Sequence, residues 1–75
     1  MAFISSFEHR TDRIARYRRE HKCGWFAAYT AEKGRILQLE TYASDGTTDQ
    51  IFQFDRRAAA ELAKIIAEVF VADRS

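Results

Sequence analysis

The chain has 75 residues, with 12 Lys or Arg, 11 Asp or Glu and a formal net charge of +1, and 47% of its residues are hydrophobic. This balance is typical of a folded globular protein and argues against intrinsic disorder. The length predicts a single domain over residues 1–75, with one small core and with residues 1–4 and 72–75 frayed. It excludes an enzyme with separate cofactor and substrate domains.

The single cysteine, Cys23, cannot form an internal disulfide, which excludes a disulfide-framed secreted domain. No apolar run approaches the roughly 20 residues that span a bilayer. The start MAFISSF has no basic residue and too short an apolar stretch for a secretory signal. We therefore expect a cytoplasmic protein that does not bind a membrane.

Charge is unevenly distributed along the chain. Residues 1–24 hold six basic and three acidic residues, a net +3, whereas residues 25–75 hold six basic and eight acidic residues, a net −2. The positive charge lies between His9 and Lys22. A local basic patch on a nearly neutral protein favours a nucleic acid or an acidic protein surface as the partner.

The first predicted element is a basic helix over residues 5–22. Ser5 and Glu8 have the spacing of a capping box, the Ala, Arg and Glu residues that follow favour helix, and Gly24 can end it. The competing interpretation is a strand over Arg13–Arg19, where side chains also alternate between two sets.

Three strands are predicted next, over residues 25–31, 35–43 and 48–54. The turn Glu32-Lys33-Gly34 joins the first two, with glycine where a positive φ is needed. Asp45-Gly46 in the second turn is a strong hairpin signal. Consecutive strands joined by tight turns predict an antiparallel meander.

The last predicted element is a helix over residues 56–70. Asp55 suits the N-cap position, and apolar residues from Ala58 to Val69 recur at helical spacing. The fold class is therefore α+β: a three-stranded antiparallel meander with the C-terminal helix on one face. The element order is α-β-β-β-α, or β-β-β-β-α if the first segment is a strand.

Strand alternation sorts the side chains between two faces of the sheet. The core face under the C-terminal helix is predicted to hold Phe26, Ala28, Leu37, Leu39, Phe52 and Phe54. The opposite face is predicted to hold Trp25, Ala27, Tyr29, Ile36, Gln38, Glu40, Tyr42, Ile51 and Gln53. A slip of one residue in any strand would exchange its two sets.

The second face has two interpretations. As an open platform, Trp25, Tyr29 and Tyr42 would stack nucleic-acid bases while Gln38 contacts their edges. As a covered face, the same aromatic residues would anchor the first helix or a second subunit.

Basic residues complete the candidate nucleic-acid site. Phosphate contacts are expected from Arg13, Arg16, Arg19, Lys33 and Arg35, although a run of charges is commonly only solvated. Arg56 and Arg57 lie in the first turn of the last helix, where the dipole disfavours positive charge. They indicate an anion site. The alternative is an ion pair between Arg57 and Glu61 one turn further on.

Catalytic motifs are missing from the sequence. It contains no Gly-rich phosphate loop, no nucleophile elbow and no histidine–carboxylate motif, so we expect no enzyme activity and no cofactor. His9, His21 and Cys23 lack the paired spacing of metal ligands, and no metal site is expected.

The run KGRILQLETYASDG, followed by IFQFDRRAAAELAKII, resembles the single-stranded-DNA-binding fold of the transcriptional positive cofactor family over about residues 25–70. Lys33-Gly34 at the turn, the apolar alternation after it and Tyr42 at the strand end carry the resemblance. It implies a curved antiparallel sheet with one long helix through which the fold dimerises. The family's Pro-Gly-Lys-rich segment before the last strand is missing here, where Asp49 and Gln50 stand.

The order α-β-β-β-α is also similar to that of the double-stranded RNA-binding domain. In that domain, basic residues at the start of the last helix contact phosphates, and Arg56 and Arg57 occupy the corresponding place. In that domain, basic residues also precede the last helix, whereas Gln53-Phe54-Asp55 stands at that place here.

Two hypotheses follow from the sequence. The first is a small non-catalytic nucleic-acid-binding protein that favours single strands and forms a homodimer. The alternative is a protein-interaction module, such as a small regulatory or phage-type inhibitory subunit, that docks through the same aromatic face.

Overall fold

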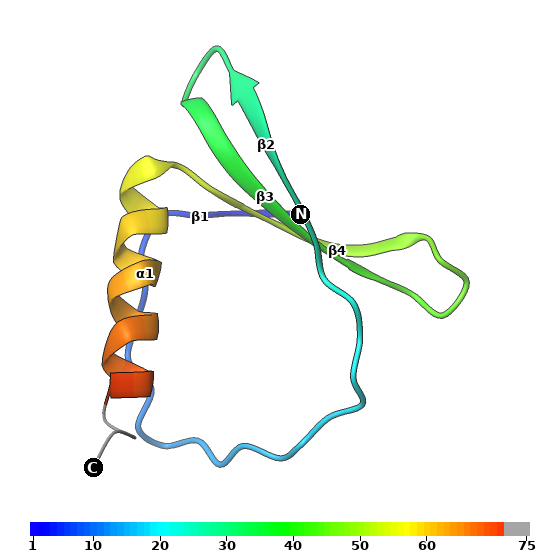
Figure 1. The fold of residues 1–75 in the computed structure, drawn as a ribbon, viewed down its shortest axis with the longest axis vertical. Coiled ribbons are helices and arrows are strands. Elements are labelled where there is room, and N and C mark those ends of the chain that lie inside the picture. The colour runs from blue at the N-terminus through cyan, green and yellow to red at the C-terminus, as the bar shows by residue number, and fades with distance from the viewer. Residues whose placement is uncertain (72–75) are drawn as a thin grey trace.

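The computed structural model describes residues 1–71, which form four strands followed by one helix (Figure 1). The elements are β1 (Ala2–Ile4), β2 (Gly24–Thr30), β3 (Gly34–Tyr42), β4 (Thr48–Phe54) and α1 (Arg56–Val71). The strands make one mixed sheet in the order β1-β4-β3-β2. The predicted α+β class, the antiparallel meander and the C-terminal helix on one face are confirmed.

Glycine turns connect the strands of the meander. Gly34 has φ 71° and Gly46 has φ 89°, and both lie in the turns where the sequence predicts a positive φ. In the second turn, the Asp45 carboxylate accepts hydrogen bonds from the Thr47 hydroxyl at 2.6 Å and from the Thr47 backbone N–H at 3.0 Å. These two bonds lower the pKa of Asp45, because they stabilise its charged form.

The N-terminal segment differs from the prediction. Residues 5–23 form neither the expected helix nor the alternative strand over Arg13–Arg19. The first strand is instead β1, which pairs in parallel with β4, so residues 2–4 are not frayed. The observed order is therefore β-β-β-β-α. The prediction for residues 72–75 lies outside the described part of the chain.

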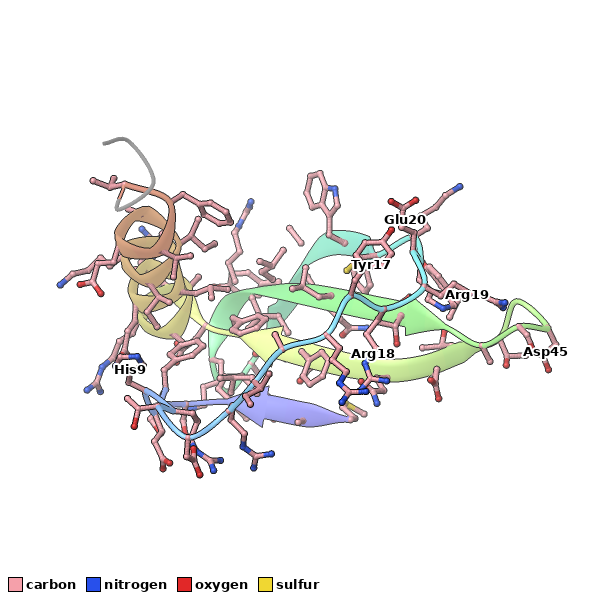
Figure 2. The ribbon with its side chains drawn as sticks, turned by 90° about the horizontal axis from the view of Figure 1, so that it is seen from below. His9, Tyr17, Arg18, Arg19, Glu20 and Asp45 are labelled. Carbon is pink, nitrogen blue, oxygen red and sulfur yellow. The ribbon has the colours of Figure 1, made fainter. Side chains whose placement is uncertain are left out.

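The missing helix has a physical reason. A short helix in water is marginal unless it buries an apolar face, and the stretch between His9 and Lys22 offers a thin stripe among many charges. Figures 1 and 2 show this segment running as an open loop across one side of the sheet, the side toward which α1 also extends.

The start of α1 is fixed by Asp55. Its carboxylate accepts a hydrogen bond from the backbone N–H of Ala58 at 2.8 Å, and its carbonyl accepts one from Ala59 at 2.9 Å. This is the N-cap geometry that the sequence predicts. α1 itself reaches Val71, one residue beyond the predicted end.

We expect Asp55→Ala to lower the free energy of unfolding by about 1 kcal/mol, because it leaves a helix N–H without its acceptor. Urea denaturation followed by far-UV circular dichroism measures this loss. Asp49→Ala is the matched control, since Asp49 is an exposed strand residue with no cap to lose. An equal effect of the two substitutions would contradict the capping role.

The core of the described residues is very small. Within residues 1–71, only Ile36, Phe54 and Ala58 are buried, with 3%, 6% and 1% of their surface exposed. The Phe7 ring stacks on Phe54 with 6.4 Å between centroids, which ties the 5–23 segment to the sheet. Leu62 of α1, at helical spacing from Ala58, is only half-buried.

The surface is correspondingly large. The chain exposes 7021 Å², whereas a compact monomer of 8.7 kDa exposes about 4,700 Å². The radius of gyration is 14.6 Å, against about 11 Å for a compact domain of this length. An excess of about 2,300 Å² is therefore open to solvent.

Candidate interaction surface

The hydrogen-bond register fixes which side chains share a face. Trp25 lies opposite Leu39, and Leu39 lies opposite Phe52, so these three residues share one face. Tyr29 lies on the same face, opposite Arg35. The prediction that Leu37, Leu39, Phe52 and Phe54 share one face is confirmed, since Leu37 and Leu39 lie opposite Phe54 and Phe52.

The prediction for β2 was wrong by one residue. It put Trp25 and Tyr29 on one face with Gln38 and Tyr42, but Gln38 lies opposite Phe26 on the other face. The single aromatic platform expected from the sequence therefore does not form. Trp25 and Tyr29 instead extend the apolar face of the sheet.

Gln38 and Tyr42 are engaged within the sheet. The Gln38 amide donates to Glu40 at 2.8 Å and accepts from Gln53 at 2.9 Å. The half-buried Tyr42 ring lies against the backbone of Gly24, where any side chain would overlap it. These contacts leave Gln38 and Tyr42 less free to contact a ligand than the platform requires.

β2 is an edge strand with an exposed aromatic surface. It pairs with β3 alone among the described residues. Trp25 and Tyr29 expose 73% and 80% of their surface, and Phe26 is exposed on the opposite face. Figure 1 shows the β2–β3 hairpin projecting beyond the rest of the sheet.

The second half of α1 carries a further apolar patch, which we call the α1 patch. It consists of the exposed residues Ile66, Val69, Phe70 and Val71. A pocket of about 480 Å³ lies beside it, lined by Ile65 and Val69 of α1 and by Phe7 to Arg10 of the N-terminal segment. The apolar stripe of α1 thus continues beyond the surface that the chain itself covers.

The arginines of the N-terminal segment are exposed, but they do not share one helix face. Arg13, Arg16 and Arg19 would lie close together on a helix, and the loop removes that arrangement. Arg10 forms ion pairs with Asp12 at 3.1 Å and Glu8 at 3.7 Å.

Seen from below in Figure 2, the rest of this segment passes in front of the sheet, and Figure 1 shows that it runs well away from the strands. His9 lies near α1, and Arg18, Arg19 and Glu20 follow along the loop. The Tyr17 hydroxyl donates to Glu20 at 3.0 Å.

Lys33 and Arg35 point to different surroundings. The Lys33 ammonium lies 5.2 Å from the centroid of the Phe3 ring, a cation–π contact with β1. Arg35 of β3 pairs with Tyr29 of β2, and both residues are exposed. The two residues do not form one basic patch.

Arg56 and Arg57 are exposed in the first turn of α1, which contains no acidic residue. In the part of the chain that the structure describes, neither arginine is within 4 Å of a carboxylate, so the predicted Arg57–Glu61 pair is not formed. The two residues lie at the opposite end of the helix from the α1 patch.

The described residues hold no cluster of three or more His, Cys, Asp or Glu that would bind a metal ion. Within residues 1–71, no helix has both the length and the apolar composition that crossing a bilayer requires. Cys23 is an exposed free thiol immediately before β2.

Sequence reasoning missed the candidate interaction surface made by the β2 edge and the α1 patch. A signal for the first was present, because Gly24–Thr30 contains no charged residue and no proline. Ile66 and Val69 of the α1 patch are predicted on the apolar face of the helix, because helical spacing shows which residues are apolar and not how far the covering sheet extends.

Comparisons with models of protein families, with curated proteins and with solved structures found no significant match.

Proposed function

We propose that this protein is a protein-interaction module whose small core is completed by docking on another protein chain. The observation that carries the proposal is the excess of about 2,300 Å² of surface over that of a compact monomer. Stable homodimers and permanent complexes bury 2,000–5,000 Å² or more in total over both partners. The exposed excess is of the size that one subunit contributes to such an interface.

The composition of this surface supports a protein partner. Its exposed large hydrophobic side chains lie on β2, on α1 and in the N-terminal segment, where Ile14 and Tyr17 are exposed. Protein interfaces are enriched in such residues and depleted in charge at their centres. Nucleic-acid surfaces are instead strongly basic, and the β2 edge has no basic residue.

Single-stranded nucleic-acid binding is the second candidate. The observation that favours it is the exposure of Arg13, Arg16 and Arg19, none of which forms an ion pair within the described residues. An exposed basic loop that leads into β2 would attract phosphates, and its affinity for them would fall steeply with salt.

Fluorescence of Trp25, the only tryptophan, separates the two candidates. For a protein-interaction module we expect an apolar dye to bind the dilute protein strongly. Single-stranded oligonucleotide should cause no salt-reversible quenching of Trp25. Dilute protein that excludes the dye and stays monomeric would overturn the proposal. Strong quenching by the oligonucleotide, reversed by salt, would favour the second candidate instead.

A further inference from the structure

The outer edge of β2 has none of the features that keep natural sheet edges apart. Natural edges carry lysine, proline, bulges or inward charges, or are very short. β2 has seven residues, GWFAAYT, and the register with β3 is unbroken from Gly24 to Thr30. An edge of this kind favours pairing with another strand.

We infer that a second copy of this chain pairs with β2 in antiparallel orientation about a two-fold axis at Ala27, making one continuous eight-stranded sheet. This inference rests on the proposed function and names the partner. Ala27 is the midpoint of β2, so this register pairs the whole strand. Moving the axis to Phe26 or Ala28 would leave two residues of each strand unpaired.

The side chains of β2 are complementary to their own copy in this register. Trp25 lies opposite Tyr29 of the second copy, and the two-fold axis repeats this pair. Between the two pairs, Ala27 lies opposite itself and leaves room for the rings. Aromatic pairs directly opposite each other stabilise antiparallel strands, and both rings are exposed, by 73% for Trp25 and 80% for Tyr29.

Charge agrees with the same register. β2 brings no charged residue to its own copy, so no like charges meet within the strand pair. At each end, Lys22 comes beside Glu32 of the second copy, because the two residues are equally far from Ala27. An axis at Ala28 would instead bring Lys33 opposite Cys23 and remove the Lys22–Glu32 pair. The central register is therefore the one that both charge and side-chain size favour.

Disulfide trapping tests the register directly. Residues directly opposite in an antiparallel pair have Cα atoms about 4.5–5.5 Å apart, within the range that a disulfide spans. In a Cys23→Ser background, we expect Ala27→Cys to form a covalent dimer under mild oxidation. Ala60→Cys is the matched control, since Ala60 is an exposed alanine of α1. Equal cross-linking of the two variants, or none with Ala27→Cys, would overturn the inference.

Sedimentation equilibrium separates this inference from the proposed function. Trp25→Ala removes both Trp25–Tyr29 pairs, so we expect the dissociation constant of the dimer to rise about 10-fold or more. Ile14→Ala is the control, because Ile14 is exposed in the N-terminal segment, outside both β2 and the α1 patch, and we expect it to change the constant less than about 2-fold. A dimer that Trp25→Ala leaves unchanged contradicts β2 pairing and keeps the proposed function. A monomer that binds apolar dye also contradicts β2 pairing and is consistent with the proposed function. A monomer that excludes the dye overturns both.

Discussion

Phe54→Ala is expected to lower the free energy of unfolding by about 3–5 kcal/mol. Phe54 is one of three buried side chains in the described residues, at the end of β4 where α1 begins. Its ring also stacks on Phe7, so the substitution opens a cavity and releases the 5–23 segment together. A folded chain of 75 residues has only about 4–11 kcal/mol of stability, so this loss leaves the variant close to unfolding.

Phe70→Ala is the control for this prediction, because Phe70 has the same side chain on an exposed site of α1. We expect it to change the free energy of unfolding by less than about 1 kcal/mol. Urea denaturation of both variants at one fixed protein concentration gives the comparison, since association would add to the apparent stability. Similar losses for Phe54→Ala and Phe70→Ala would mean that the stacked pair is not the centre of the core.

The meander and α1 could be predicted from the sequence because local signals determine them. Gly34 and Gly46 stand where the turns need a positive φ, and Asp55 caps the helix that follows β4. Each of these signals acts within a few residues of the chain. Neighbouring strands in the sequence are then also neighbours in the sheet, which makes the topology of this part predictable.

β1 could not be predicted because its partner is distant in the sequence. Ala2 pairs with Phe52 and Ile4 with Phe54, across most of the chain. The sequence between them favours a helix locally, with Ser5 and Glu8 at capping spacing. Tertiary pairing of β1 with β4 and stacking of Phe7 on Phe54 replace that preference with an open loop.

The sequence points to two aromatic residues of β2 that are exposed, but not to the face on which they lie. The sequence predicts that Trp25 and Tyr29 are functional aromatic residues; the structure shows only that both are exposed. Their face was wrong, because both alternating sets of β2 contain an aromatic residue and the sequence pattern is nearly symmetric. Only the pairing across the Gly34 turn decides between the two sets.

Ile36 is a core residue that the predicted faces placed outside the core. The sequence placed Ile36 on the open aromatic face, yet it is 3% exposed. It lies opposite Ala28 on the face that also holds Gln38, and adjoins Leu37, which faces Phe54. Both faces are therefore covered at the end of the sheet where α1 starts, and much of β2 is left exposed.

We therefore expect Ile36→Ala to lower the free energy of unfolding by about 2–5 kcal/mol, because it leaves a cavity on a second buried face. Ile51→Ala is the matched control, since Ile51 pairs with Glu40 on the same face but is only half-buried. Its loss should be smaller than that of Ile36→Ala in the same urea titration. If the two losses were equal, depth of burial on this face would not govern stability. A large loss confined to Ile36 would instead place the centre of the fold at the start of α1, and leave β2 and the α1 patch as surface for a partner.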